Sequence, residues 1–311
     1  MVGCLSDLPA ATCDVFTDQP YAGNPLAIVE QADALSVAQM QTIAREFNLS
    51  ETIFVMSPDD PGHTAKVRIF FPNDEIPFAG HPTIGCAIFL ALKSAPDGDF
   101  DTVITLEEQA GLVPVDVSRR AGKMRAQFTA PVLPYWPETG TLPGDALLAE
   151  AVGLTADKIG FGAHRAGIWR GGPGYLYIPV ADTTALAASQ PNRHAWDDAM
   201  AMSGMEGAYL YTPAEDCDFR ARMFAPDGGV PEDPATGSAS AILAAQLHAS
   251  TPLGDGDTRL SLRQGIEMGR PSEIGLTIRV EAGIISKIRV SGTAVPISEG
   301  RIALPPVHAP T

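Results

Sequence analysis

The sequence predicts an α+β fold of two similar domains, in each of which a sheet wraps around a central apolar helix. Three observations predict it. Short strand-like runs dominate the chain, two helical segments are apolar on almost every side, and one strand–loop–proline–helix pattern occurs twice, about half the chain length apart. A chain of 311 residues also has the length of two ordinary domains.

Runs rich in β-branched and aromatic residues, bounded by turn-forming residues, predict the strands. The 27 prolines and 30 glycines are scattered, which indicates many short elements joined by tight turns. The predicted strands are residues 51–55, 65–71, 102–106, 112–117, 174–178, 208–211, 218–224, 259–263 and 284–290.

One surface helix has clear boundaries in the sequence. Ser36 and Gln39 have the spacing of a capping box, and an apolar stripe from Val37 to Phe47 follows at helical spacing. Asn48 is a plausible stop, because asparagine tolerates the left-handed conformation at a helix end. We therefore expect an amphipathic helix from about residue 37 to 47.

Two other helices, 81–92 and 233–245, lack a polar face, and such helices are buried on all sides. Each opens on a polar residue, His81 or Asp233, followed by a proline, which the first helical position tolerates. A purely structural role for Asp233 is that of the N-cap residue of the second helix.

These helices belong to an internal repeat. The segments Arg68–Pro72 and Arg222–Pro226 precede them, and His81–Gly85 then aligns with Asp233–Gly237. The repeat predicts two domains of one design.

The predicted N-terminal domain covers residues 1–130 and the C-terminal domain covers residues 131–294. The boundary lies in the Pro-, Gly- and Thr-rich stretch 131–143. Residues 295–311 are expected to pack back on the first domain.

The charge balance limits the partners. With 21 basic and 37 acidic residues, the formal net charge is -16, which opposes binding to nucleic acid or to an anionic membrane. The longest apolar run, Thr83–Leu92, is too short to span a bilayer, and no signal peptide is recognisable. We expect a cytoplasmic protein.

The four cysteines lie far apart, with no zinc-type spacing, so we expect no metal and free thiols in a reducing compartment. Cys86 lies inside an apolar helix, where core packing is its expected role. The sequence contains no P-loop and no G-x-S-x-G elbow. His63, His164, His194 and His248 have no spaced partners and are expected to be structural or on the surface.

The helix starts are candidate binding sites. The free N–H groups at the N-terminus of a buried helix attract anions. Gly80 allows close backbone approach, and Thr236, Gly237 and Ser238 add hydroxyls and bare backbone at the second helix. If the two domains face each other, these starts would hold a small carboxylate in one cleft.

Glu51 is the candidate acid–base residue. It begins an apolar strand and shares a strand face with Ile53 and Val55. Desolvation there would raise the pKa of its carboxyl towards neutrality, where a Glu exchanges protons efficiently. The structural alternative is a solvated Glu at a strand end.

Several ordered motifs along nearly the whole chain resemble the PhzF-like phenazine-biosynthesis isomerases, which share the diaminopimelate-epimerase fold. The motifs are Asp14–Thr17, Gly23–Pro25, Gln39–Glu51, Arg68–Pro72, Glu75–Pro82, Glu232–Ala239, Gln264–Ser272 and Val290–Gly292.

The resemblance implies two domains with strongly curved, mostly antiparallel sheets, a homodimer, and no metal or organic cofactor. It implies isomerisation of trans-2,3-dihydro-3-hydroxyanthranilate, in which Glu51 moves a proton between ring carbons. His81 and Asp233 match the family's other catalytic residues. The implied substrate-binding residues are Asn24, Ser50, Gly80, Thr236, Gly237 and Ser238. The roles of Cys86 and of the 264–272 loop stay open.

Two alternatives stay open beside the isomerase. An epimerase or racemase of the same fold resembles relatives that use two cysteines at the helix starts, which this chain lacks there. A non-catalytic protein that binds small carboxylates would keep the cleft, but retention of Glu51, His81 and Asp233 together weighs against it. The physiological substrate is not predicted by the sequence.

Overall fold

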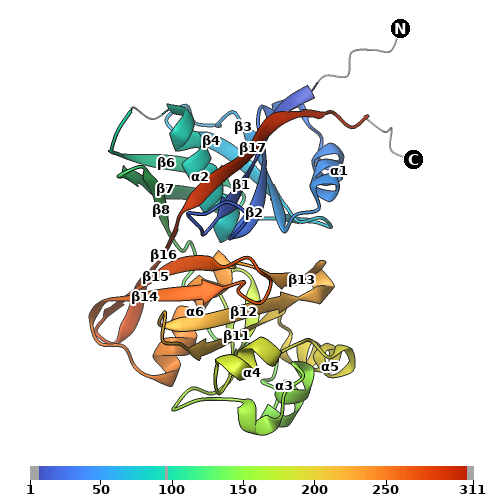
Figure 1. Cartoon of the computed structure of the whole chain (residues 1–311), viewed down its shortest axis with the longest axis vertical. Helices are drawn as coiled ribbons and strands as arrows, with labels where there is room; N and C mark the ends of the chain where they lie inside the picture. The colour runs from blue at the N-terminus through green and yellow to red at the C-terminus, as the bar shows by residue number, and fades with distance from the viewer. Residues whose placement is uncertain (1–6, 95–96, 307–311) are drawn as a thin grey trace. The chain divides into compact units, whose positions relative to one another are not determined.

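The computed structural model describes residues 7–94 and 97–306. Contacts divide the chain into two compact units (Figure 1). Unit 1 comprises the described residues up to Pro131 together with those from Ser291 onward, and unit 2 is Val132–Val290. The predicted domain boundaries, after residues 130 and 294, lie within a few residues of these limits, and the division into two domains of one design stays a prediction.

Unit 1 has two α-helices, one short 3₁₀ turn and nine strands in its described residues. In chain order these are β1 (Asp7–Val15), β2 (Asn24–Val29), η1 (Ala32–Ala34), α1 (Val37–Phe47), β3 (Glu51–Met56), β4 (Ala65–Phe70), β5 (Glu75–Ile76), α2 (Gly80–Ser94), β6 (Phe100–Glu108), β7 (Gly111–Arg120), β8 (Lys123–Thr129) and, after unit 2, β17 (Ala294–Ala303).

Unit 2 contains the remaining elements. These are α3 (Asp145–Ala151), η2 (Ala156–Lys158), β9 (Gly167–Arg170), β10 (Gly174–Pro179), α4 (Thr183–Ala188), α5 (Arg193–Ser203), β11 (Gly207–Pro213), β12 (Phe219–Ala225), η3 (Pro226–Gly228), β13 (Val230–Asp233), α6 (Gly237–Ser250), β14 (Gly256–Gln264), β15 (Ser272–Glu281) and β16 (Ile284–Gly292), whose last residues enter unit 1.

The two units share one strand topology. In unit 1, β2 pairs antiparallel with β1 and parallel with β3, β4 pairs antiparallel with β3 and β5, and β6 runs parallel to β4 and antiparallel to β7. In unit 2, β10 pairs in the same way with β9 and β11, β12 with β11 and β13, and β14 with β12 and β15. The predicted α+β fold with two similar halves is confirmed.

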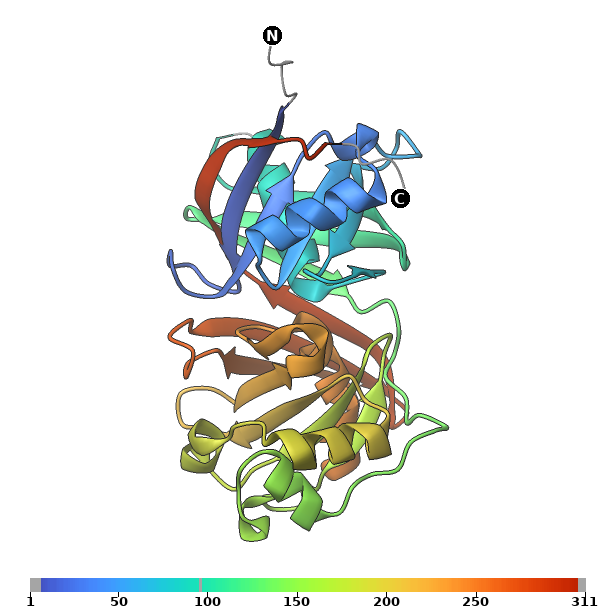
Figure 2. The same cartoon turned by 90° about the vertical axis from the view of Figure 1, so that its right-hand side faces the viewer.

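The predicted strands are all present, and the amphipathic helix is α1 with the predicted capping box. The helix packs on one side of the sheet (Figure 2). Met40 and Ile43 of its stripe belong to one buried cluster with Phe54 and Phe70. The other side faces α2, which contacts β1, β2, β3, β6, β7, β8 and β17. Because helices cover both sides of β3, its run of residues is buried almost throughout.

In unit 2 the central helix is α6, and its small residues are matched by large tyrosines on the strands around it. Tyr175 and Tyr177 of β10 and Tyr209 and Tyr211 of β11 point towards it, and their hydroxyls bond to Ser238 Oγ, the Ala239 carbonyl, Ser240 Oγ and Gln246 Nε2. The opposite side of these strands packs against α3–α5 around Trp196. The helices predicted from the sequence do not include α3, α4 or α5.

The strand β17 returns to unit 1 and pairs antiparallel with β1, the red strand beside the blue one in Figure 1. This agrees with the expectation for the segment that follows residue 294, up to the end of the described residues at 306. No helix among the described residues is long and apolar enough to cross a bilayer.

The structure corrects the register of the repeat. Both central helices begin at a glycine, Gly80 in α2 and Gly237 in α6. Aligned on these, Glu75 matches Glu232, and His81 matches Ser238 rather than Asp233. The predicted alignment paired Pro82 with Pro234, but these prolines are not equivalent. Pro82 lies inside the first turn of α2, whereas Pro234 lies before the start of α6.

Candidate active site

Glu51 lies at the start of β3, on the side of the sheet that faces α2. Successive strand residues point to opposite faces, and Phe54 packs against α1, so Glu51, Ile53 and Val55 face the central helix. Glu51 is 7% exposed. The predicted strand face is correct, and this carboxyl is buried rather than solvated.

The parallel pairing of β2 and β3 brings Asn24 to the same end of the sheet. Leu26 of β2 is opposite Glu51, and Asn24 precedes Leu26 by two residues on the same face. Asn24 is fully buried, and Ser50, directly before the strand, is half-buried.

His81 completes this group from the first turn of α2. Its Nδ1 lies 3.1 Å from Glu51 Oε2 and 3.4 Å from Asn24 Nδ2. Burial lowers the pKa of His81 to about 3, although the Pro25 carbonyl, which accepts a hydrogen bond from the ring, acts in the opposite direction. Burial therefore favours the neutral imidazole, which lies directly against the Glu51 carboxyl.

Gly80, the first residue of α2, is buried beside His81. The first-turn N–H groups of a helix have no partner within the helix and carry the positive end of its dipole. Unit 1 thus places a buried carboxyl, a neutral imidazole and backbone donors together.

In unit 2 Asp233 is the last residue of β13 and is 7% exposed. The expectation that it caps α6 is wrong, because α6 begins four residues later and Thr236 occupies the N-cap position. The Thr236 hydroxyl donates a 2.6 Å hydrogen bond to Asp233 Oδ2. The Asp233–Thr236 turn places this carboxyl beside the helix start formed by Gly237 and Ser238.

Gln264, the last residue of β14, holds this turn from one side. Its Nε2 donates to the Asp233 carbonyl at 2.7 Å and to Thr236 Oγ1 at 3.0 Å, and its Oε1 accepts from the Thr236 N–H at 3.2 Å. Gly265 follows with φ +74°, and a Cβ there would lie 2.7 Å from the Pro234 carbonyl. Gln264 is not among the site residues predicted from the sequence, and the available signal for it was its position in the resemblance motif Gln264–Ser272.

An ion pair holds Glu232, the residue directly before this turn. Arg222 of β12 donates through Nε and Nη2 to the two carboxylate oxygens of Glu232, both at 2.8 Å. Its Nη1 donates to three carbonyls at the end of α4, those of Leu186, Ala187 and Ser189. The residue before Asp233 is therefore tied to two elements.

Unit 1 contains the corresponding pair at the matching place. Arg68 donates to Glu75 through Nε at 2.6 Å and through Nη2 at 2.5 Å. Both pairs lie on the short hairpin that leads into a central helix, which explains why an arginine recurs before each helix in the sequence.

The carboxyl of Glu51 has no counterpart in unit 2. Leu26 pairs with Glu51 in unit 1, and the corresponding inward-facing pair in unit 2 is Tyr175 with Gly207. A Cβ at Gly207 would lie 2.6 Å from the Phe224 carbonyl, so the position takes no side chain without rearrangement. The duplicated fold thus carries a carboxyl at this inward-facing strand position in unit 1 and not in unit 2.

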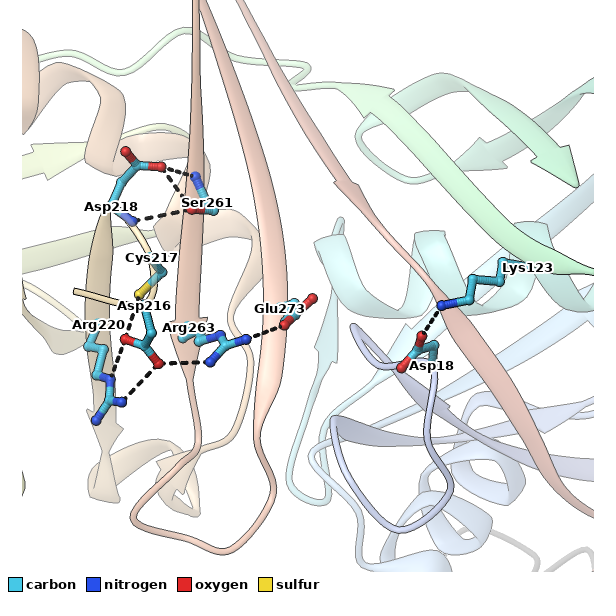
Figure 3. A network of polar contacts seen from close by, with 9 residues as sticks. All are labelled: Asp18, Lys123, Asp216, Cys217, Asp218, Arg220, Ser261, Arg263 and Glu273. Carbon is cyan, nitrogen blue, oxygen red and sulfur yellow. Dashed lines mark hydrogen bonds and ion pairs between the residues drawn. The ribbon is translucent and has the colours of Figure 1, made fainter. Parts of the chain in front are cut away.

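A surface network next to Gln264 ties β14 to its neighbours (Figure 3). Asp216 accepts hydrogen bonds from Arg220 and Arg263, which hold the pKa of its carboxyl well below the usual range, and Arg263 also pairs with Glu273 of β15. Exposed pairs contribute little stability singly. Their position matters here because Arg263 and Gln264 are adjacent and point to opposite faces.

The remaining histidines have structural contacts or are exposed. His63 bonds to Glu107, His164 to Tyr211, and His248 to Leu253 and Gly283, whereas His194 is exposed. Cys86 is buried in α2, as expected. Among the described residues, no group of three or more His, Cys, Asp or Glu side chains is arranged to hold a metal ion.

Comparison with known proteins places this geometry in a family. The family model for phenazine biosynthesis-like proteins, PhzC-PhzF, matches residues 13–300. The chain belongs to this PhzF-type family. A trans-2,3-dihydro-3-hydroxyanthranilate isomerase of Pseudomonas aeruginosa is 36% identical over 295 residues, covering 94% of this chain and 98% of that protein.

An uncharacterized isomerase of Mesorhizobium japonicum is 42% identical over 298 residues, covering 93% of this chain and 96% of that protein. Family membership and these relatives show that the chain is an isomerase.

Solved structures agree with the fold. A PhzF-family protein of Bacillus anthracis superposes with a TM-score of 0.84 at 23% identity, covering 96% of this chain and all of that one. A predicted epimerase of Pseudomonas aeruginosa superposes with a TM-score of 0.78 at 30% identity, covering 96% of this chain and 99% of that one.

Proposed function

We propose that this PhzF-type isomerase moves a proton on a small cyclic or unsaturated carboxylate without a cofactor, with Glu51 as the acid–base residue. The observation that carries the proposal is the buried contact between Glu51 Oε2 and His81 Nδ1, which is 3.1 Å long. This chemistry needs a group that can bind and release a proton, and a buried carboxyl against an imidazole, as Glu51 is at the end of the sheet beside the α2 start, is suited to that role.

The proposed step needs one base. Glu51 takes a proton from one carbon of the unsaturated system, the electron pair shifts along the double bonds, and the same carboxyl returns the proton to another carbon. Charge and protons balance without a further reactant. The absence of a counterpart to Glu51 at Gly207 fits a single-base mechanism.

His81 and Asp233 are proposed as its catalytic partners. His81, held neutral by burial, orients the Glu51 carboxyl and shares its proton. Asp233 is proposed to hold a polar group of the substrate. This requires one substrate molecule to reach both Glu51 and Asp233, which is part of the proposal.

Backbone and hydroxyl donors are proposed to bind the substrate's carboxylate. Gly80, Thr236, Gly237 and Ser238 lie at helix starts, where free N–H groups attract anions. Asn24 and Ser50 flank Glu51 and are proposed to contact the substrate.

The proposed substrate class follows from the named relative. Trans-2,3-dihydro-3-hydroxyanthranilate is a ring carboxylate with the unsaturation that the mechanism needs, and the Pseudomonas aeruginosa relative is named as its isomerase. We propose it as the first compound to test.

The test is proton exchange in deuterated water. The wild type, Glu51→Gln and the control Glu46→Gln, an exposed residue of α1, are incubated with this compound, and ring deuteration is followed by NMR. We expect exchange in the wild type and the control and a loss of about 10²-fold or more in Glu51→Gln. Exchange that persists in Glu51→Gln contradicts the role of Glu51, and none in the wild type removes this substrate.

The alternative is an epimerase, favoured by the 30% identity to a structure titled as a predicted epimerase. Two-cysteine racemisation does not fit the helix starts, which carry His81 and Ser238. Inversion of amino-acid substrates, followed by polarimetry, with no ring exchange in the first test, would favour this alternative.

Two further expectations complete the proposal. We propose a homodimer, tested by light scattering on the protein as it elutes from a size-exclusion column, where a single-chain mass of 32.7 kDa would contradict it.

We also propose a cytoplasmic location, tested by cell fractionation.

A further inference from the structure

Glu108 is a buried carboxyl in unit 1 that the proposed chemistry does not use. It is the last residue of β6 and is 8% exposed. In the shared topology β6 corresponds to β14, since each strand has nine residues, follows the central helix and runs parallel to the strand before the hairpin. The counterpart of Glu108 is therefore Gln264.

The loops behind these two residues also correspond. After β6, the Ala110 N–H donates to the Pro77 carbonyl at 3.0 Å. After β14, Gly265 lies against the carbonyl of Pro234, the proline that matches Pro77. Each strand end thus packs against the segment that leads into its central helix.

Gln264 holds the Asp233–Thr236 turn because its side chain has both a hydrogen-bond donor and an acceptor. Its amide N–H₂ and its carbonyl oxygen hold the Asp233–Thr236 turn. An ionised carboxylate at the same position would only accept, whereas a protonated carboxyl both donates and accepts.

The Thr83 hydroxyl has two oxygen atoms within hydrogen-bond distance. Thr83 Oγ1 lies 2.7 Å from Glu108 Oε1 and 2.7 Å from the Ala79 carbonyl oxygen. A hydroxyl has one proton, and the Ala79 carbonyl only accepts. Both contacts are hydrogen bonds at once if the Thr83 proton points to Ala79 and Glu108 carries a proton of its own.

We propose that Glu108 is a neutral carboxylic acid that acts as a positioning residue, donating its proton to the Thr83 hydroxyl and so fixing the Ala79–His81 start of α2. It does in unit 1 what the Gln264 amide does in unit 2. The protonation state and contacts proposed for Glu108 do not depend on the proposed function. The effect of Glu108 on turnover does rest on the proposed function.

The surroundings of Glu108 favour the neutral form. Burial raises the pKa of Glu108 to about 8, although the contact with the Thr83 side chain acts in the opposite direction. Cys86 of α2 is the titratable group whose charge couples to it, and burial keeps that thiol protonated. Lys66 of β4 and Glu107 carry charges on the other face of the sheet, where they bond to Asp59 and His63.

Deprotonation has a specific consequence. Once Glu108 is ionised, Thr83 has a single proton for two acceptors, so either the carboxylate or the Ala79 carbonyl loses its hydrogen bond. Because Ala79 directly precedes Gly80 and His81, the loss loosens the helix start that holds His81 against Glu51.

The direct test is the titration of the carboxyl itself. In full-length protein labelled with ¹³Cδ-glutamate, the resonance that disappears in Glu108→Gln is expected to titrate near pH 8, as a neutral acid in neutral buffer. A resonance that is already ionised at pH 6 overturns the inference, whatever the protein's activity.

A second test uses stability, with Glu46→Gln as the exposed control. The unfolded state loses the Glu108 proton near pH 4.5 and the folded state near 8, so stability falls as pH rises between these values. The wild-type unfolding constant should therefore rise relative to that of Glu108→Gln by up to about tenfold per pH unit. A constant ratio overturns the inference.

A third test measures how the pH dependence of kcat/KM responds to a change at Glu108. With an active wild type, kcat/KM is expected to fall above about pH 8, whereas Glu108→Gln, whose amide keeps a donor, should retain activity and lose this alkaline limb. An unchanged limb in Glu108→Gln overturns the positioning role. If the wild type shows no turnover, the proposed function fails, while the NMR and stability tests still decide the state of Glu108.

Discussion

The side-chain amide of Gln264 donates a 2.7 Å hydrogen bond to the backbone carbonyl of Asp233. This bond, with those to Thr236, joins the end of β14 to the turn before α6. Asp233 therefore keeps its place through a side chain that is 31 residues away in the sequence and fully buried.

Replacing Gln264 by Leu should lower kcat by about 10²-fold through misplacement of Asp233, and destabilise the protein by about 1–3 kcal/mol through unsatisfied buried groups. The matched control is Gln246→Leu, another buried glutamine of unit 2, which bonds to Trp169, Arg165 and Tyr211. It should cost similar stability with a much smaller loss of kcat. Equal losses of kcat in both variants would show that Gln264 has only a general structural role.

A substitution at Gly265 tests the close approach behind this turn. Gly265 and Gly283 have nearly the same backbone angle, φ +74° and +75°, but a Cβ at Gly265 meets the Arg270 and Pro234 carbonyls whereas one at Gly283 meets open space. Gly283→Ala should cost about 1 kcal/mol of unfolding free energy, from strain alone. Gly265→Ala should cost about 1–3 kcal/mol more. Urea denaturation measures both, and equal costs would argue against the contact.

The two Arg–Glu pairs form a second matched comparison. Arg222 has a side chain 7% exposed and caps three carbonyls, whereas Arg68 is 21% exposed. Lysine cannot reproduce the fork of two parallel hydrogen bonds. Arg222→Lys should therefore destabilise the protein by about 1–3 kcal/mol, because lysine keeps the charge but leaves buried carbonyls without a donor, and Arg68→Lys should cost less. Thermal unfolding of both variants provides the measurement, and the reverse order would contradict this reading.

The low pKa of His81 predicts acid sensitivity. The unfolded histidine binds a proton near pH 6.5 and the folded one only near 3, so the unfolded state binds more protons between these values and stability falls as pH falls through this window. His81 alone should change the free energy of unfolding by up to about 1.4 kcal/mol per pH unit in this window. His81→Asn should lose it, whereas His194→Asn, at an exposed position, should keep it. Parallel stability curves for wild type and His81→Asn between pH 4 and 6.5 would refute the prediction.

The helix boundaries show where local sequence was sufficient. Ser36 and Gln39 determine the start of α1 through bonds within a single turn, and the prediction was confirmed. The start of α6 depends instead on the Asp233–Thr236 turn, which is held by Arg222 and Gln264 from other strands. Because these contacts are distant in sequence, the proline pattern alone placed Asp233 at the wrong end of the turn.

By itself, the sequence determined many of the strands, the helix α1 and the two central helices, the presence of a repeat, the family resemblance and the identity of Glu51, His81 and Asp233 as candidates. These features can be recognised from hydrophobic periodicity and short motifs, because the interactions behind them join residues that are close in the sequence. Only the tertiary structure decided that Glu51 touches His81, that Gly207 takes the place of a second carboxyl, and that Glu108 stands where unit 2 has Gln264. Each depends on strand pairing between distant segments, which no local pattern specifies.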